Sequence, residues 1–121
     1  MRERLNLGGL IDLLKRSEPG QNVKFDFGGA VPTSVDSYRG YYEDLAIGFD
    51  DDPDDYPTVS EFLKMLQEAV GKEFTGYKGG EYKMTRKSRV WVANYSHTSG
   101  TTIVGIRDCN YMTVLHTDWE E

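Results

Sequence analysis

The chain has 121 residues, of which 38% are apolar and 28% charged, and a net charge of −6. Its 8 Tyr, 5 Phe and 2 Trp are too many aromatic side chains for a disordered chain, so we expect one folded domain spanning residues 1–121. The acidic balance excludes a general nucleic-acid coat, because phosphate binding depends on accumulated Lys and Arg. No apolar run approaches the roughly 18 residues of a membrane helix, and the single cysteine, Cys109, excludes an internal disulfide. These features predict a cytoplasmic protein that contacts neither membrane nor nucleic acid directly.

The first part of the chain predicts a helix followed by two strands. Apolar residues at positions 7, 10, 11 and 14 repeat with helical spacing, after Asn6 as the N-cap and before Pro19. Residues 23–27 alternate between apolar and charged side chains, as in a half-buried strand, and are followed by Gly28. Residues 31–36 are typical of a loop, and residues 38–49 predict a second strand. We expect the two strands to pair as in a hairpin.

A loop, a second helix and further strands follow. The aspartates and prolines at 50–57 predict the loop, because their charges repel and proline donates no ladder hydrogen bond. Thr58 and Glu61 have the spacing of a capping box, and Gly71 ends the predicted helix. Strands are predicted within 74–84 and at 90–94, 101–106 and 111–115, with short connections that favour antiparallel pairing. The predicted fold class is α+β, an antiparallel β-sheet meander with two helices packed on one face.

Charge is divided along the chain. Residues 43–68 contain nine acidic residues against one base, Lys64, whereas residues 72–89 contain six bases against Glu73 and Glu81. This division fits an anion-binding rim on an acidic protein, a pairing of the two segments within a monomer or dimer, or the solvated faces of ordinary elements.

The acidic loop matches a calcium-binding loop only in part. Four carboxylates occupy positions 1, 3, 5 and 12 of such a loop: Asp50, Asp52, Asp54 and Glu61. Position 6, where the sharp turn needs Gly, holds Asp55, and we interpret Glu61 as a helix cap. We therefore expect neither a metal nor a cofactor.

A small hydrolase is an alternative. Ser96, His97 and Asp108 supply the residue types of a catalytic triad, and His116 is a second possible base. Any small protein offers such a set, and no strained nucleophile turn such as G-x-S-x-G is present. We predict no catalytic residue and a protein that is not an enzyme.

Planar and cationic side chains suggest binding of a small nucleotide instead. Aromatic faces stack on bases, guanidinium groups bind phosphate through two hydrogen bonds, and an asparagine amide reads a base edge. The predicted ligand-binding residues are Arg39, Tyr41, Tyr82, Arg86, Trp91, Asn94 and Arg107. For Trp91, packing in the core is an equally good interpretation.

Four segments resemble a family of small phage proteins, the Thoeris anti-defence proteins of the first type. They are VKFDF at 23–27, SYRGYYEDL at 37–45, GYKGGEYKM at 76–84 and VWVAN at 90–94, and the likeness spans most of residues 23–115. The resemblance implies a homo-oligomer that sequesters a cyclic ADP-ribose-type immune signal, or a cyclic oligonucleotide, without cleaving it. It also implies pockets between subunits, with an aromatic residue on adenine and arginines on the phosphates. The negative net charge and Glu81 in the basic segment count against strong phosphate binding.

We therefore expect a non-enzymatic phage protein that sequesters a small cyclic nucleotide signal in the host cytoplasm and so inhibits bacterial anti-phage defence. The alternative is an acidic protein-interaction inhibitor, anti-CRISPR-like or directed at a polymerase, in which residues 50–55 mimic nucleic-acid phosphates. Replacing the aspartates of that loop would separate the two, because only the alternative depends on them.

Overall fold

The computed structural model describes residues 4–39, 41–76, 78–94 and 100–119. These residues form two helices, α1 (Leu7–Lys15) and α2 (Val59–Ala69), and eight strands. The strands are β1 (Asn22–Phe25), β2 (Val31–Tyr38), β3 (Tyr41–Asp50), β4 (Glu73–Thr75), β5 (Glu81–Lys83), β6 (Val90–Val92), β7 (Thr101–Asp108) and β8 (Met112–Trp119). Within the described ranges, both helices fall short of the length and apolar character that a bilayer-spanning helix needs.

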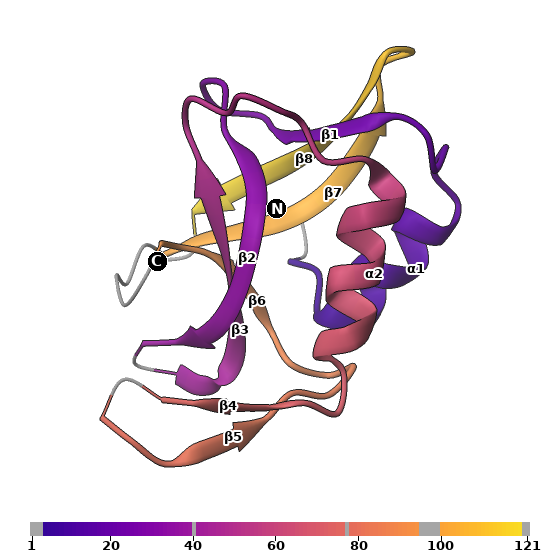
Figure 1. The fold of residues 1–121 in the computed structure, drawn as a ribbon. Helices are drawn as coiled ribbons and strands as arrows, with labels where there is room; N and C mark the ends of the chain where they lie inside the picture. Colours follow the sequence, from indigo (N-terminus) through magenta and orange to yellow (C-terminus); the bar gives the residue numbers. More distant parts are fainter. Residues whose placement is uncertain (1–3, 40, 77, 95–99, 120–121) are drawn as a thin grey trace.

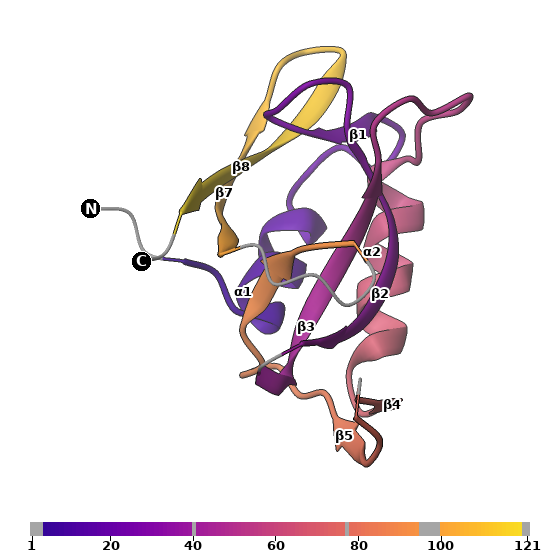
Figure 2. The ribbon, with the colours of Figure 1, turned by 90° about the vertical axis from the view of Figure 1, so that its left-hand side faces the viewer.

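Six of these strands form one mixed sheet that curls into a nearly closed barrel (Figure 1). The strand order is β1-β8-β7-β6-β3-β2, with β1 parallel to β8, β3 parallel to β6, and antiparallel pairing elsewhere. Strands β1, β3, β6 and β8 therefore run in one direction, and their carboxyl ends share one edge of the sheet. The two outermost strands approach each other where the Phe25 N–H donates to the Ala30 carbonyl at 2.9 Å. Figure 2 shows the curved β2 lying along β3.

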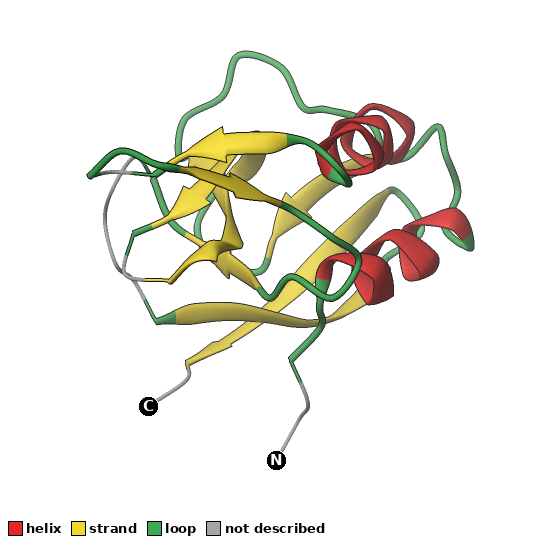
Figure 3. Cartoon of the chain, turned by 90° about the horizontal axis from the view of Figure 1, so that it is seen from below, coloured by secondary structure: helices red, strands yellow, loops and turns green. Residues whose placement is uncertain are grey.

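The apolar core lies between the inner face of the barrel and the two helices. Side chains alternate along a strand, so Leu45 and Ile47 of β3 point inward, where they are buried with Phe25 of β1. Leu10 of α1 and Phe62 of α2 join the same cluster. Both helices lie on one side of the strands, to the right in Figure 1, and the carboxyl end of β8 lies on the other (Figure 3).

Local sequence signals set the helix ends as predicted. The Asn6 side chain accepts from the Gly9 N–H at 2.8 Å. The Thr58 hydroxyl accepts from the Glu61 N–H at 3.1 Å, and the Glu61 carboxylate accepts from the Thr58 N–H at 2.9 Å. Gly71 follows α2 with a φ of +82°, which a residue without a Cβ adopts at little cost. The interpretation of Glu61 as a helix cap is confirmed.

The predicted fold class is wrong. The sequence predicts an α+β antiparallel meander with two helices packed on one face, whereas the protein is mostly β and its main sheet is mixed and curled. The antiparallel succession is confirmed for β6, β7 and β8. The region 74–84 forms a separate two-stranded sheet of β4 and β5. Each parallel pairing joins strands that are distant in sequence, and the side-chain period within a strand does not specify its partner.

β2 occupies residues that the sequence predicts as a loop. Pro32, Ser34 and Asp36 are typical loop residues, but β2 is an edge strand. An edge strand has a neighbour on one side only, so a residue such as proline, which lacks an N–H, is tolerated there. The register of β2 against β3 shifts between Pro32 and Ser34, as at a β-bulge. The hairpin partner of β3 is therefore β2, and the predicted hairpin of residues 23–27 with 38–49 is wrong.

Gln21 secures the parallel pairing of β1 with β8. Its amide group donates to the Asp108 carboxylate at 3.1 Å and to the Asn110 carbonyl at 3.0 Å. Its side-chain oxygen accepts from the Thr113 hydroxyl at 2.8 Å. The hydrogen bond from Gln21, and secondly that from the backbone of Asn110, lower the pKa of Asp108 against an opposing effect of burial.

We expect the Asp108→Asn variant to lose a pH-dependent part of the free energy of unfolding. A carboxyl whose pKa is lower in the folded chain stabilises the fold above its ordinary value of 3.8. This contribution disappears as the pH falls through the folded pKa. The stability gap between wild type and variant should therefore be largest near neutral pH and shrink in acid. Urea unfolding followed by circular dichroism at several pH values measures it, and a gap independent of pH would contradict the assigned cause.

Candidate functional site

The parallel pairing of β3 with β6 brings Asp44 beside Arg89. Its register matches Leu45 with Val90, and the Leu45 N–H donates to the Arg89 carbonyl at 2.9 Å. Because Leu45 and Val90 point into the core, their alternating neighbours Asp44, Arg89 and Trp91 lie on the outer face. Asp44 accepts from the Trp91 indole N–H at 2.9 Å and from Arg89 Nε at 3.2 Å. Two donors thus satisfy a carboxylate residue that is only 8% exposed.

Three aromatic rings stack in parallel on this outer face. The centroid of the Trp91 ring lies 4.5 Å from that of the Tyr38 ring and 5.8 Å from that of the Tyr41 ring, with interplanar angles of 2° and 6°. The guanidinium of Arg4 lies 4.1 Å from the centroid of the Trp91 ring, a cation–π distance. Tyr38 and Trp91 are buried, but Tyr41 is 53% exposed. One aromatic ring is therefore presented to solvent on a packed support.

A hollow of about 310 Å³ lies beside Tyr41. This tyrosine hollow is lined by Tyr41, Tyr42, Glu43, Asp44, Tyr82 and Arg89. The rings of Tyr42 and Tyr82 stack with their centroids 5.2 Å apart. Gly76 makes room for this pair, because a Cβ there would lie 2.7 Å from the Tyr82 ring and 3.1 Å from the Tyr42 ring. The hollow therefore has aromatic walls contributed by β3 and β5.

The tyrosine hollow is lined by one cation, Arg89, and two carboxylates, Glu43 and Asp44. The guanidinium of Arg89 lies 5.2 Å from the Tyr41 ring centroid, and its side chain is 44% exposed. Its Nε donates a hydrogen bond to Asp44, and no described residue accepts from its Nη atoms. Glu43 lines the same hollow. On β5, a hydrogen bond with Glu73 raises the pKa of Glu81, with further contributions from the charge of Glu73 and from burial. Arg89 is thus preorganised for one small anionic group, whereas an extended polyanion would meet carboxylates.

The structure brings together Tyr41, Tyr82 and Trp91 of the seven predicted ligand residues. Tyr41 and Tyr82 line the tyrosine hollow, and Trp91 supports the ring of Tyr41. Trp91 itself packs with Tyr38 and Ala46 in a small buried cluster. Trp91 therefore does not line the hollow itself; its indole ring stacks with Tyr41 and donates its N–H to Asp44, and both of these residues line the hollow.

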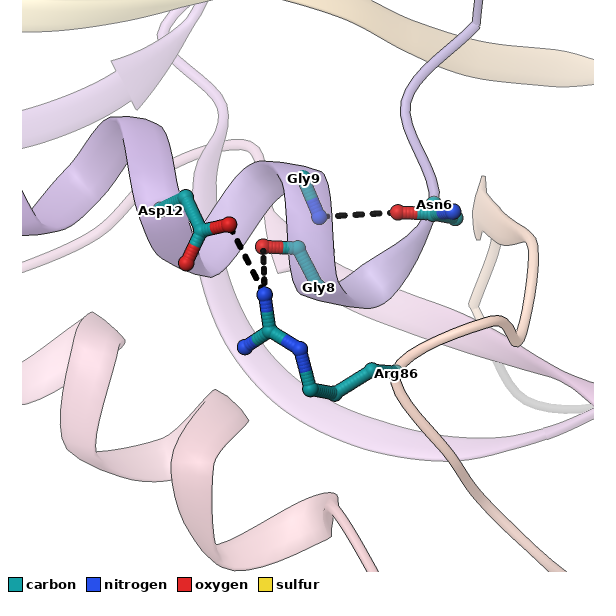
Figure 4. A network of polar contacts seen from close by, with 5 residues as sticks. All are labelled: Asn6, Gly8, Gly9, Asp12 and Arg86. Atoms are coloured by element: carbon teal, nitrogen blue, oxygen red, sulfur yellow. Dashed lines mark hydrogen bonds and ion pairs between the residues drawn. The ribbon is translucent and has the colours of Figure 1, made fainter.

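Arg86 contacts the N-terminal helix instead (Figure 4). Its Nη2 donates to the Asp12 carboxylate at 2.8 Å and to the Gly8 carbonyl at 3.3 Å. A Cβ at Gly8 would lie 3.0 Å from atoms of Arg86, so the glycine makes room for the guanidinium arm. Arg86 does not line the tyrosine hollow.

Arg39, Asn94 and Arg107 also lie outside the tyrosine hollow. Arg39 is exposed in the turn after β2, and Arg107 is exposed on β7. Asn94 follows β6 and lines a different cavity, where its Oδ1 accepts from the Phe49 N–H at 2.7 Å. The described part of one chain therefore does not gather the seven residues around one ligand.

Four of the six residues that line the tyrosine hollow are not among the seven predicted ligand residues: Tyr42, Glu43, Asp44 and Arg89. Arg89 lies immediately before β6 and two positions from Trp91, so strand alternation places both side chains on one face, and this spacing is a signal that identifies Arg89. In the sequence, nothing distinguishes Asp44 from the other acidic residues of the segment 43–68. Its role depends on the pairing of β3 with β6, which no local pattern encodes.

The alternative catalytic and metal sites gain no support from the described residues. Ser96 and His97 lie outside them. His116 Nδ1 lies 3.5 Å from the Asp26 carboxylate, which also accepts from the Thr117 hydroxyl at 2.6 Å. In a catalytic triad the hydroxyl donates a hydrogen bond to the imidazole, but here the Thr117 hydroxyl and the His116 imidazole both contact the Asp26 carboxylate. In the described ranges, no three His, Cys, Asp or Glu side chains are grouped to hold a metal ion.

We expect the Asp44→Ala variant to lower the free energy of unfolding by about 2 kcal/mol, because it leaves the buried Trp91 N–H without its acceptor. The Asp12→Ala variant is the matched control. It removes the half-exposed ion pair with Arg86 and should cost less than about 1 kcal/mol. Urea unfolding of both variants measures the difference. Equal losses would show that Asp44 is not the buried anchor described above.

Comparison of the chain with models of protein families, with curated proteins and with solved structures finds no match.

Proposed function

We propose that the chain is a non-enzymatic binding protein that captures a small nucleotide in the tyrosine hollow. The observation that supports this most directly is the exposed ring of Tyr41 beside the guanidinium of Arg89, which Asp44 holds in place. A nucleobase stacked on an aromatic face contributes about 1–3 kcal/mol of binding free energy. A guanidinium binds a phosphate through two charge-assisted hydrogen bonds. The two side chains together match the base and the phosphate of a nucleoside monophosphate.

The charge of the hollow favours one phosphate for each copy of the chain. Asp44 partly neutralises Arg89, and Glu43 lines the same hollow, so a second phosphate requires another cation. Arg107 is exposed and outside the hollow, and it would supply that cation from a second copy. A cyclic ADP-ribose-type signal, which carries two phosphates, would then lie between subunits of a homo-oligomer.

The chemistry of the hollow supports capture without turnover. The tyrosines stack, and Arg89 carries a fixed positive charge. The buried carboxylate of Asp44 already accepts from two donors, so it is not placed to take a proton from a ligand. Sequestration of an intact signal in a host cytoplasm, with inhibition of anti-phage defence as its result, is the activity that these properties fit.

We expect adenosine 5′-monophosphate to bind at least tenfold more tightly than adenosine, because only the former engages Arg89 through a phosphate. Isothermal titration calorimetry measures both ligands, together with cyclic ADP-ribose isomers. Heating the complex and running chromatography should then return intact ligand. Absence of binding by every nucleotide, or recovery of a degraded product, would overturn the proposal.

Four variants test where the ligand binds. Tyr41→Ala should weaken it about tenfold through lost stacking, and Arg89→Lys should weaken it similarly because lysine lacks the planar fork. Tyr111→Ala, which removes an exposed tyrosine in the turn before β8, is the matched control and should leave the affinity unchanged. Arg107→Lys should affect only ligands that lie between subunits, and analytical ultracentrifugation with each ligand reports that assembly.

A second candidate function, an acidic protein-interaction inhibitor, is favoured by a groove of about 470 Å³ beside α2. Its apolar surface includes Phe62 and Met65, and its carboxylates are Asp50, Asp54, Asp55 and Glu61. None of the ion pairs among the described residues engages the loop at 50–55. Such a surface fits a basic partner segment that carries an apolar side chain.

Asparagine at positions 50, 51, 52, 54 and 55 should abolish binding to a basic partner and leave nucleotide affinity unchanged. A fluorescently labelled arginine-rich peptide with one leucine is a suitable probe, followed by polarisation at increasing salt, because such binding weakens as charges are screened. If the peptide binds the wild type and the variant equally, the acidic groove is not its site.

A further inference from the structure

Another cavity, of about 490 Å³, lies at the edge of the barrel where the carboxyl ends of β3, β6 and β8 meet the start of β7. We call it the mouth pocket; its described lining includes Phe27, Phe49, Val92, Asn94, Thr117 and Trp119. Shared strand direction brings these residues together, since they follow or end strands that run the same way. The carboxyl end of β8, which contributes to this lining, lies away from both helices, on the left in Figure 1.

Aromatic rings form the apolar wall of the mouth pocket. Phe27 stacks on Phe25 with centroids 5.3 Å apart, and meets Phe49 edge to face at 5.3 Å. Phe27 and Phe49 are half-buried and pack against the core, which fixes their ring orientations. Trp119, at the end of β8, is 75% exposed. A pocket of this volume falls within the range of about 300–1,000 Å³ that small-molecule sites occupy.

Two polar groups of the pocket have fixed hydrogen-bonding roles. Asn94 Oδ1 accepts from the Phe49 N–H at 2.7 Å, which orients the amide and leaves its Nδ2 as a donor. The Thr117 hydroxyl donates to Asp26 at 2.6 Å, which leaves its oxygen as an acceptor. Neither group is charged, and no described lining residue is charged. An anionic group of a ligand buried here would therefore meet no described lining cation that compensates its charge.

We propose that the mouth pocket binds a flat, uncharged and largely apolar small molecule, independently of nucleotide capture in the tyrosine hollow. The rings of Phe27, Phe49 and Trp119 supply the contact surface. The Asn94 amide and the Thr117 hydroxyl set the orientation of a polar substituent on the ligand.

The test uses two dyes that share a ring system. N-phenyl-1-naphthylamine is uncharged, and 1-anilinonaphthalene-8-sulfonate adds one negative charge. The uncharged dye should bind saturably with one site for each chain, and the sulfonate should bind at least tenfold more weakly because no described lining cation compensates it. Equal binding of the two dyes, or no saturable binding of the uncharged one, would overturn the proposal.

Variants at exposed aromatic residues place the dye without risk to the core. Trp119→Ala should weaken binding of the uncharged dye about tenfold. Tyr111→Ala removes a ring that is 88% exposed in the turn before the same strand and should have no effect. Loss of affinity in both variants, or in neither, would refute the site. Adenosine 5′-monophosphate should not displace the dye, and Arg89→Lys should not weaken it, so this proposal and nucleotide capture can fail separately.

Discussion

The parallel pairing of β3 with β6 joins the two parts of the barrel. On one side of it lies the β2–β3 hairpin, and on the other the strands β6, β7, β8 and β1. Three residue pairs make the junction: Leu45 with Val90, Ala46 with Trp91, and Ile47 with Val92. So short a junction depends on its side chains. Leucine, isoleucine and valine bury its inner face, and the hydrogen bonds of Asp44 secure its outer face.

The same junction positions the tyrosine hollow and the mouth pocket. Immediately before β6 it sets Arg89 against Asp44 and thereby forms the charged side of the tyrosine hollow. At the carboxyl end of β6 it carries Val92 and Asn94 into the mouth pocket, beside Phe49 of β3. The two surfaces differ in chemistry because one lies on the outer face, with an arginine and carboxylates, and the other at the apolar opening of the barrel. One strand pair therefore positions both of the proposed binding surfaces.

Local patterns predicted the local structure well. The N-cap at Asn6 and the capping box of Thr58 and Glu61 depend on residues three positions apart, so the sequence contains all the information that they need. The alternation at 23–27 likewise predicted β1. The wrong predictions concern strand pairing. β1 pairs with β8, and β3 with β6, although long stretches of chain separate the partners. A period of two residues is compatible with either parallel or antiparallel neighbours. Pro32 and Asp36 concealed β2 because an edge strand tolerates residues that a central strand excludes.

The candidate site was predictable to the extent that it follows residue type. The search for aromatic side chains near cations singled out Tyr41 and Tyr82, and these two line one hollow together with Arg89. Arg86 could not be assigned from sequence, because its partners on α1 are more than 70 residues away in the chain. Asp44 was concealed for the same reason, since only the folded sheet distinguishes it from its acidic neighbours.

The indole resonances of the two tryptophans test the central claim most directly. Trp91 donates its N–H to Asp44 behind the tyrosine hollow, whereas Trp119 lies at the mouth pocket. In ¹H–¹⁵N spectra recorded during titration with adenosine 5′-monophosphate, the Trp91 indole signal should shift progressively and that of Trp119 should stay in place. A shift of Trp119 alone, or of neither signal while calorimetry reports binding, would contradict nucleotide capture in the tyrosine hollow.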